Sequence, residues 1–350
     1  MTGSAEIELT EEVPFQVMRR TWQPVANSAD LPLGKTLAYR LFDTDLVVAR
    51  LSSGLMVAGD MCPHKGARLS RGHICGEELQ CAYHGWRFNG AGECTNIPSL
   101  VDPPKDKLRL SHLHNFPVQE RYGMVWVQME PDATVRIPDV PEFEDPAWTF
   151  LIGPATPFKA GFRREIENYL DMTHFAFAHA TTLGKAASPT VPEMTITSYE
   201  DGFQMDAPFP ALESPHEQPG KLQSAHHRRQ RCFLPNFTTI RQSFTDGDER
   251  VLVHVPSPNA QGECTCFWAL AVSPGFKGPP PQDQLQFAIK VLDEDRIMCE
   301  SQVPPEVPIN PSRGGWGVLV TPGDTLANTF QRTFRKYLLE RLAIRANGAG

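Results

Sequence analysis

The sequence predicts an α+β protein with an N-terminal all-β domain, followed by a domain that combines an antiparallel sheet with helices. Short β-like runs with turn signals fill residues 22–127. A Pro-rich connection occupies residues 131–146, and beyond it strand-like runs alternate with segments of helical period. The 350 residues are enough for two such domains. We expect a flexible acidic tail at 1–18, the β domain at 19–127 and the second domain at 128–350.

The elements of each domain follow from local patterns. In the second domain we expect one helix from about Arg163 to Leu183, ended by Gly184, and another from about Gln282 to Cys299. A C-terminal helix is predicted by apolar residues at helical spacing, and strands are predicted between the first two helices. The apolar residues of that last helix are Leu326, Phe330, Phe334, Leu338 and Leu342.

Composition excludes several classes of function. The formal charge of -8 and the pI near 5.8 give no general attraction to nucleic acid or anionic lipid. The N-terminus has no basic segment followed by an apolar run, and no stretch of about 18 apolar residues offers a membrane span. Eight cysteines are too few for a disulfide scaffold. We therefore expect a cytoplasmic protein with no nucleic-acid or membrane partner.

Two Cys-plus-His pairs form the first candidate site. Cys62 and His64 are separated by one residue, and Cys81 and His84 by two. Thiolate and imidazole together suit zinc or iron-sulfur iron, and the tight first pair is unusual for a structural zinc finger. A [2Fe-2S] centre with two Cys on one iron and two His on the other fits better. A zinc-stapled binding protein remains the alternative.

The residues around these ligands are small. Gly66, Ala67 and Gly85 allow backbone N–H groups to approach the sulfurs. Hydrogen bonds from these groups raise the reduction potential of such a cluster. The pattern of CPH, sixteen residues and CAYHGW resembles the Rieske signature. Lys65 stands where that family usually has Arg, a difference that does not affect the four ligands. The other cysteines are interpreted as structural thiols, and His254 as an ordinary polar or core residue.

The second candidate site begins in RREIENYLDMTHFAFAHATTLG. On an ideal helix Asp171 lies about 60° from His174, and Asn168 a further 60° back. His174 and His179 are about 140° apart, so they can share a metal only if the helix ends or bulges between them. Two His and one carboxylate form the facial triad of non-heme iron oxygenases.

The missing carboxylate is sought in QLQFAIKVLDEDRIMCESQ. Asp295 lies on the apolar stripe of this predicted helix, between Leu292 and Cys299. An acid on an inward stripe needs a partner, and a metal is one. We therefore predict Asp295 as the third ligand of a mononuclear Fe(II), with Asp293 in reserve.

Together these motifs resemble the Rieske non-heme iron oxygenases, and in particular the homotrimeric monooxygenase and demethylase branch. The resemblance covers about Trp22 to Gln302. It implies a helix-grip catalytic domain at 128–350 and a role for Asp171 as the bridge that carries electrons from His84 of a neighbouring subunit to His174. It also implies a separate reductase or ferredoxin as electron donor.

The predicted function is that of a terminal oxygenase component. We expect O₂-dependent hydroxylation or oxidative O- or N-demethylation of a small aromatic or heterocyclic compound. No G-x-G-x-x-G motif or Walker loop is found, so NAD(P)H is expected to act only through the reductase. Ring cis-dihydroxylation and a Rieske electron carrier without oxygenase activity are the alternatives. Candidate pocket residues are Phe175, Phe177 and the strands in 232–270, while the basic run 226–231 is interpreted as a solvated strand edge or a docking patch for the electron donor.

Overall fold

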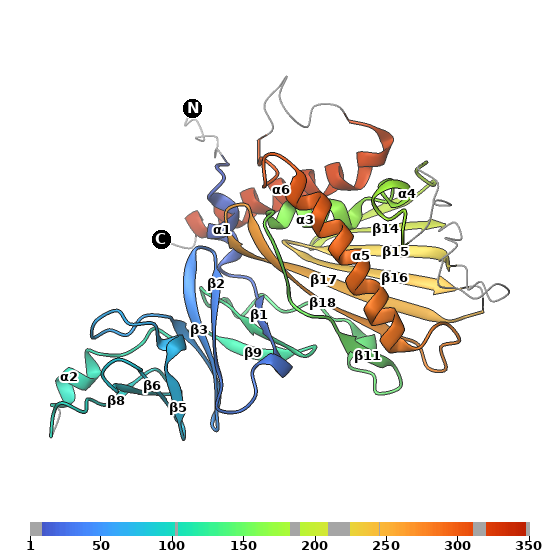
Figure 1. Ribbon diagram of the computed structural model, residues 1–350. Helices are drawn as coiled ribbons and strands as arrows, with labels where there is room; N and C mark the ends of the chain where they lie inside the picture. The colour runs from blue at the N-terminus through green and yellow to red at the C-terminus, as the bar shows by residue number, and fades with distance from the viewer. Residues whose placement is uncertain are drawn as a thin grey trace, which may run out of the picture. The chain divides into compact units, whose positions relative to one another are not determined.

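The computed structural model describes residues 9–101, 104–182, 190–208, 225–244, 246–310 and 320–347. It divides into two compact units, one of Arg19–Ile137 and one that joins Met1–Met18 to Pro138–Gly350 (Figure 1). The first contains only short sheets and one short helix among its described residues, and the second contains a long antiparallel sheet and several helices. The predicted α+β architecture is therefore confirmed.

The β unit contains three small antiparallel sheets. The first has the order β1 (Gln23–Asn27), β10 (Met124–Val127) and β9 (Val118–Arg121). The second has the order β2 (Thr36–Leu41), β3 (Thr44–Leu51) and β4 (Gly54–Gly59). The third has the order β5 (His73–Cys75), β6 (Glu78–Gln80), β7 (Arg87–Asn89) and β8 (Cys94–Asn96), and the short helix α2 (Lys105–Arg109) follows it.

The boundary between the units lies near residue 137, ten residues beyond the predicted one. Hydrogen bonds tie the residues after β10 back to the β unit. The indole of Trp22 donates to the Val135 carbonyl at 3.1 Å, and Arg121 donates to the Ile137 carbonyl at 3.0 Å. A Pro-rich composition predicts a connection, but it does not show which side of the connection is anchored.

The predicted flexible tail at 1–18 is wrong for its second half, while residues 1–8 lie outside the described residues. Leu9 is buried, and Val13–Met18 form the helix α1 with Val13 and Val17 buried. Glu11 pairs with the buried Arg163 at 2.7 Å. A buried guanidinium requires an opposite charge nearby. One of the acidic residues that suggested a solvated tail therefore has a structural role instead.

The second unit is built on one antiparallel sheet. Its strand order is β11 (Thr149–Ile152), β18 (Glu263–Val272), β17 (Glu249–Ala260), β16 (Phe237–Phe244), β15 (Ala225–Phe233), β14 (Gly202–Pro208) and β13 (Thr195–Tyr199), and β12 (Thr156–Phe158) also pairs with β18. The helices are α3 (Phe162–Leu170), α4 (Phe175–Ala178), α5 (Pro281–Ser301) and α6 (Thr325–Asn347). Short 3₁₀ turns occur in both units. They are Ser28–Asp30 and Leu69–Arg71 in the first unit, and Pro141–Phe143 and Pro322–Asp324 in the second.

The long helices pack on this sheet. In Figure 1, α5 runs across the strands β16 to β18 on the face that also carries α3. The apolar stripe predicted for the C-terminal helix is buried at Leu326, Phe330, Phe334 and Leu338, whereas Leu342 is half-exposed. Among the described residues no helix is both long and apolar enough to cross a membrane.

The run 226–231 is neither a sheet edge nor uniformly solvated. It belongs to β15, which pairs with β14 on one side and β16 on the other. Side chains alternate across a strand, so Arg228 and Gln230 are buried while Arg229 is exposed and pairs with Asp206 at 2.7 Å. The interpretation as a solvated edge is therefore wrong.

Candidate metal centres

The two Cys–His loops of the β unit have the same backbone hydrogen bonds. In the first loop the Cys62 N–H donates to the Ala67 carbonyl at 2.8 Å, and the Gly66 N–H donates to the Cys62 carbonyl at 2.9 Å. In the second, the Cys81 N–H donates to the Trp86 carbonyl at 2.8 Å, and the Gly85 N–H donates to the Cys81 carbonyl at 3.0 Å. Gly66 and Gly85 both have φ of +70°, a conformation that favours glycine.

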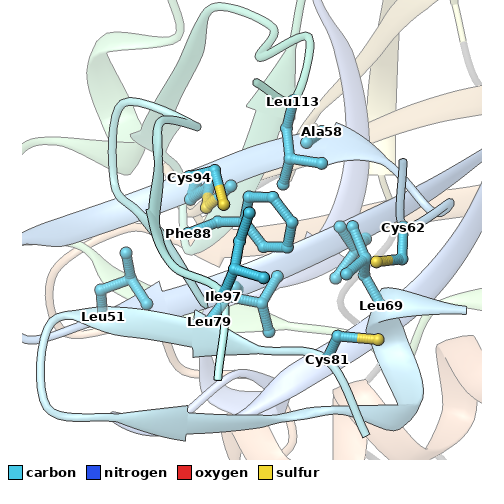
Figure 2. Close-up of a cluster of buried hydrophobic side chains, with 13 residues drawn as sticks. Leu51, Ala58, Cys62, Leu69, Leu79, Cys81, Phe88, Cys94, Ile97 and Leu113 are labelled. Atoms are coloured by element: carbon cyan, nitrogen blue, oxygen red, sulfur yellow. The ribbon is translucent and has the colours of Figure 1, made fainter. Parts of the chain in front are cut away.

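These matching loops bring all four side chains together. Cys62 and Cys81 are buried in one apolar cluster with Leu69 and Phe88, and Figure 2 shows both sulfurs at the same end of it. The rings of His64 and His84 lie 4.5 Å apart between centroids, and Trp86 stacks on His64 at 4.7 Å. The histidines occupy different positions in the two loops, which explains the unequal spacing in the sequence.

The chemistry of this donor set fits a metal cluster. Burial raises the pKa of the Cys62 thiol to about 11, while the backbone N–H groups of His64 and Lys65 act in the opposite direction. A thiolate there therefore needs a cation beside it. The buried Nδ1 of His64 has no hydrogen-bond partner among the described residues, so it is available as a ligand. Two thiolates and two imidazoles are the ligands of a Rieske [2Fe-2S] centre.

The second group arises where α3 ends. The single helix predicted over 163–183 is wrong, because α3 stops at Leu170 and Asp171 is extended at φ -74°, ψ 139°. The Asp171 side chain accepts hydrogen bonds from the Thr173 N–H at 2.7 Å and hydroxyl at 2.8 Å, a local turn that competes with further helix. Gly184, the predicted helix end, lies outside the described residues.

The one-turn helix α4 then places the two histidines. His174 precedes it and His179 follows it. Their Nε2 atoms are 3.1 Å apart, and Oδ1 of Asp295 lies 3.3 Å from the first and 3.0 Å from the second. Two ligands bound at right angles to one metal at ~2.1 Å would be about 3 Å apart. The triangle therefore has the dimensions of three ligands on one side of a metal ion.

The outer nitrogens of both histidines face carboxylates. Nδ1 of His174 lies 3.2 Å from Asp171, and Nδ1 of His179 lies 2.9 Å from Glu294. Glu294 also accepts hydrogen bonds from the hydroxyls of Thr181 and Thr182. Such contacts fix each imidazole with its Nε2 toward the metal position. Glu294 is a functional residue that helical periodicity alone did not predict.

The electrostatics also fit a cation. Burial opposes the ionisation of Asp295, yet its contacts with His174 and His179 lower its pKa below the ordinary value. Burial likewise acts to lower the pKa of His174, but Asp171 and Asp295 raise it to about 9. The Oδ1 atom of Asp295 is buried and makes no well-aligned hydrogen bond in the described structure, although both Nε2 atoms are near it. A metal ion between the three groups would satisfy it.

A cavity with about 120 Å³ of interior space opens beside this triangle. His174, His179 and Asp295 form part of its wall, together with Asn168 from the last turn of α3. Much of the rest is apolar, from β16, β17, β18 and α5. The apolar lining residues are Phe175, Ile240, Leu252, Leu270, Phe287, Ala288, Val291 and Leu292.

The structure separates the candidates that the sequence left open. Asp293 points away from the triangle, where it is 57% exposed and pairs with Arg296. Phe177, a predicted pocket residue, is 73% exposed and does not line the cavity, whereas Phe175 does. His254 also lines the cavity, with Nδ1 held by the buried Glu165 at 3.0 Å. His254 lies two residues after Leu252 on β17, so both side chains project from the same face of the sheet. This spacing was a signal in the sequence that could have placed His254 in the cavity wall.

Comparison with known proteins agrees with both donor sets. Residues 21–117 match the Rieske [2Fe-2S] domain, and residues 158–340 match the vanillate O-demethylase oxygenase C-terminal domain. The methylxanthine N3-demethylase NdmB of Pseudomonas putida is 30% identical over 308 residues, which cover 83% of this chain and 83% of the relative. The chain belongs to the Rieske non-heme iron oxygenases.

Solved structures support the assignment to the Rieske oxygenases. The structure of Pseudomonas putida CBB5 NdmA with caffeine has a TM-score of 0.77 at 25% identity and covers 95% of this chain and 94% of its own. Dicamba monooxygenase bound to dicamba, at 20% identity and a TM-score of 0.75 over 93% of this chain and 99% of that one, shows the shared fold.

The predicted cofactors and the predicted class of enzyme are confirmed. As a Rieske oxygenase, the protein uses a [2Fe-2S] cluster and a mononuclear iron, receives electrons from a separate reductase or ferredoxin, and acts on a small molecule. The catalytic domain distinguishes it from a bare electron carrier, and the Rieske match distinguishes it from a zinc-stapled binding protein.

Proposed function

We propose that this oxygenase inserts one oxygen atom into a C–H bond of a small aromatic or heterocyclic compound, by hydroxylation or by oxidative O- or N-demethylation. The observation that carries the proposal is the triangle of His174, His179 and Asp295 at the wall of a largely apolar cavity. Three ligands on one side of an iron leave positions for O₂ beside a substrate. Relatives named for N-demethylation and for the O-demethylation of 5,5'-dehydrodivanillate support the same reaction class.

We assign the ligands of both centres by residue. Cys62, His64, Cys81 and His84 hold the [2Fe-2S] cluster, and His174, His179 and Asp295 hold the mononuclear iron. Iron at the second position supplies the activation of O₂. The apolar residues of the cavity wall orient the substrate ring and limit the access of water. Asn168 also lines this cavity, and we propose that it takes part in catalysis.

We further propose that electrons enter the iron site through Asp171 from His84 of a neighbouring subunit, in a homotrimer. Asp171 already contacts His174, and its side chain is 30% exposed. His84 is exposed, and Tyr83 beside it and Met61 next to Cys62 in the other loop are each 65% exposed. Exposed apolar side chains around a redox centre are typical of a surface that another protein covers.

Demethylation has a defined balance. One oxygen atom of O₂ enters a methyl C–H bond, and the resulting hydroxymethyl group leaves as formaldehyde with cleavage of the carbon–heteroatom bond. The second oxygen atom becomes water with two electrons from the donor and two protons. Ring cis-dihydroxylation would place both oxygen atoms in the product and release no formaldehyde. The cytoplasm suits this reaction, because it supplies a reduced electron donor and because the six cysteines outside the cluster form no disulfide in the described structure.

The test uses the purified protein, loaded with iron and sulfide, with a surrogate reductase, NADH and a panel of methylated aromatics and heterocycles. Oxygen uptake and formaldehyde release are followed together. We expect at least one compound to give formaldehyde in step with substrate-dependent O₂ uptake, or a monohydroxylated product. A dihydrodiol as the main product, or no substrate-dependent O₂ uptake across the panel, would overturn the proposal.

The bridge is tested by Asp171→Asn. Both metal centres should be retained, while reduction of the cluster no longer supports turnover, with a loss of about 100-fold or more. The matched control is Asp293→Asn, because Asp293 is an exposed carboxylate outside the site. Cluster and iron content are measured in each variant, and robust product formation by Asp171→Asn would sink the assignment.

A further inference from the structure

The floor of the cavity contains a row of polar side chains on three neighbouring strands. Arg228 on β15 is directly opposite Gln242 on β16, and Gln242 is directly opposite Arg250 on β17. Directly paired residues of antiparallel strands project from the same face of the sheet. All three line the cavity. We call them the cationic row.

The two guanidinium groups are held in fixed places. Arg250 donates from Nε and Nη2 to the Gln242 side-chain carbonyl at 2.9 and 2.6 Å, and from Nη1 to that of Gln284 at 3.2 Å. Arg228 lies over the ring of Phe175 at 5.4 Å. These contacts restrict the rotation of both side chains, so little conformational entropy remains to be lost when a ligand binds.

The surroundings favour a negative charge at this place. Arg228 is only 4% exposed, and burial lowers the pKa of its guanidinium to about 10. The nearby Arg250 acts in the same direction, while Tyr169, Asp171 and Asp295 act in the opposite direction. Once iron is bound, the charge of Asp295 is offset by the metal. An anion beside both arginines would then reduce their mutual repulsion.

The adjoining row of the same face is apolar where it lines the cavity. Ile240 lies two residues from Gln242 on β16, and Leu252 lies two residues from Arg250 on β17. Leu270 on β18 is paired with Leu252, while the buried Gln230, which is paired with Ile240 on β15, does not line the cavity. A flat apolar ring can rest on this row while a charged substituent reaches the arginines. The two rows are therefore complementary to the two ends of an aromatic acid.

We propose that the substrate of this oxygenase carries a carboxylate, which the cationic row of Arg228, Gln242 and Arg250 binds, while its ring contacts Ile240, Leu252 and Leu270. The inference rests on the proposed function, since it names the substrate class of the same cavity. Guanidinium groups bind carboxylates with paired hydrogen bonds, which an amide of the same shape cannot replace with equal strength.

The experiment measures binding without turnover. Calorimetric titration of the oxidised, metal-loaded protein uses 2-, 3- and 4-methoxybenzoate and the three matching methoxybenzamides. We expect the best benzoate to bind roughly 10- to 100-fold more tightly than its amide. In Arg250→Gln this preference should fall to about twofold. Arg228→Gln should behave alike if it folds, and the Arg250 variant decides the matter if it does not.

The matched control is Arg229→Gln. Arg229 is the next residue on β15, points to the opposite face and pairs with Asp206 at the surface. It should keep the full preference of the parent protein. Equal affinity of the parent for benzoates and amides, no measurable binding of any benzoate, or an unchanged preference in Arg250→Gln would each overturn the proposal. Turnover is measured separately. Demethylation of neutral compounds only would contradict the proposed carboxylate-bearing substrate and leave the proposed oxygenase reaction intact.

Discussion

The two metal centres of this oxygenase are built in opposite ways. The proposed cluster ligands come from two loops of one short stretch, and each loop is closed by the same pair of backbone hydrogen bonds. The proposed iron ligands come from the ends of a one-turn helix and from α5, far apart along the chain. The first centre is therefore specified by local sequence, and the second by the packing of α5 against the segment after α3.

The groups that support the ligands differ in the same way. Backbone N–H groups of His64 and Lys65 face the Cys62 sulfur, so main-chain conformation does most of the positioning in the β unit. In the catalytic unit Asp171 and Glu294 hold the outer nitrogens of the two histidines. At the iron site, substitution of the supporting side chains Asp171 and Glu294 should therefore have a different effect from substitution of a ligand. At the cluster the support comes from the backbone, so substitution of a loop glycine is the corresponding test.

The largest effect is expected at Cys81, a proposed cluster ligand. Cys81→Ser should abolish the visible absorption and the EPR signal of the reduced cluster, and with them all turnover, because serine is a poor substitute for a thiolate on iron. Cys75→Ser is the matched control, since Cys75 lies in the same unit and its thiol donates a hydrogen bond to Gln80. An unchanged cluster signal in Cys81→Ser would contradict the assignment.

The next effect concerns Asp295, the proposed third iron ligand. Asp295→Ala should lose the mononuclear iron and all oxygenase activity while retaining the cluster, because only two protein ligands remain. Asp293→Ala should retain both centres, since Asp293 is exposed and pairs with Arg296. Metal analysis together with EPR distinguishes the two variants. Full mononuclear iron in Asp295→Ala would require another carboxylate at the site.

A smaller effect is expected for the carboxylate behind His179. Glu294→Gln keeps the shape but removes the charge that orients the imidazole, so iron affinity should fall about 10- to 100-fold. Anaerobic competition with a chelator measures this affinity, and Asp293→Asn on the same helix is the control. If the Glu294 variant binds iron as tightly as the parent, the carboxylate only closes the Thr181 and Thr182 turn.

The smallest effects should distinguish the two cysteine loops. Gly66→Ala introduces a side chain at φ +70° without crowding, at a cost of about 1 kcal/mol. In Gly85→Ala the new Cβ would also lie 3.2 Å from Cγ of Pro98, so the cost should be larger. The urea concentration at which half of the cluster absorbance is lost ranks the two variants. The reverse order would contradict the description of the loops.

The sequence was most informative where structure is local. The two-part α+β fold and the Cys–His loops follow from short patterns, and α5 and α6 follow from helical periodicity. The burial of Asp295 on the inward face of α5 follows from the same periodicity. In each case the deciding sequence pattern lies within one helix or one short stretch of the chain.

The errors arose where a competing local interaction or a tertiary partner decides. The Asp171 side chain captures the Thr173 N–H and ends the helix, although the surrounding residues have helical spacing. Glu294 lies off the apolar stripe of α5, so helical periodicity gives no signal for it, yet His179 at the end of α4 contacts it there. Arg228 and Arg250 look like solvated charges until the strand pairing places them in one row.

The most direct test of two separate centres is the iron and sulfide content of fully reconstituted protein, combined with EPR before and after reduction. We expect about three irons and two sulfides per chain, with one iron outside the cluster. In Asp295→Ala the content should fall to about two irons with unchanged sulfide. Parent protein that holds only the two cluster irons after full loading would contradict the mononuclear site.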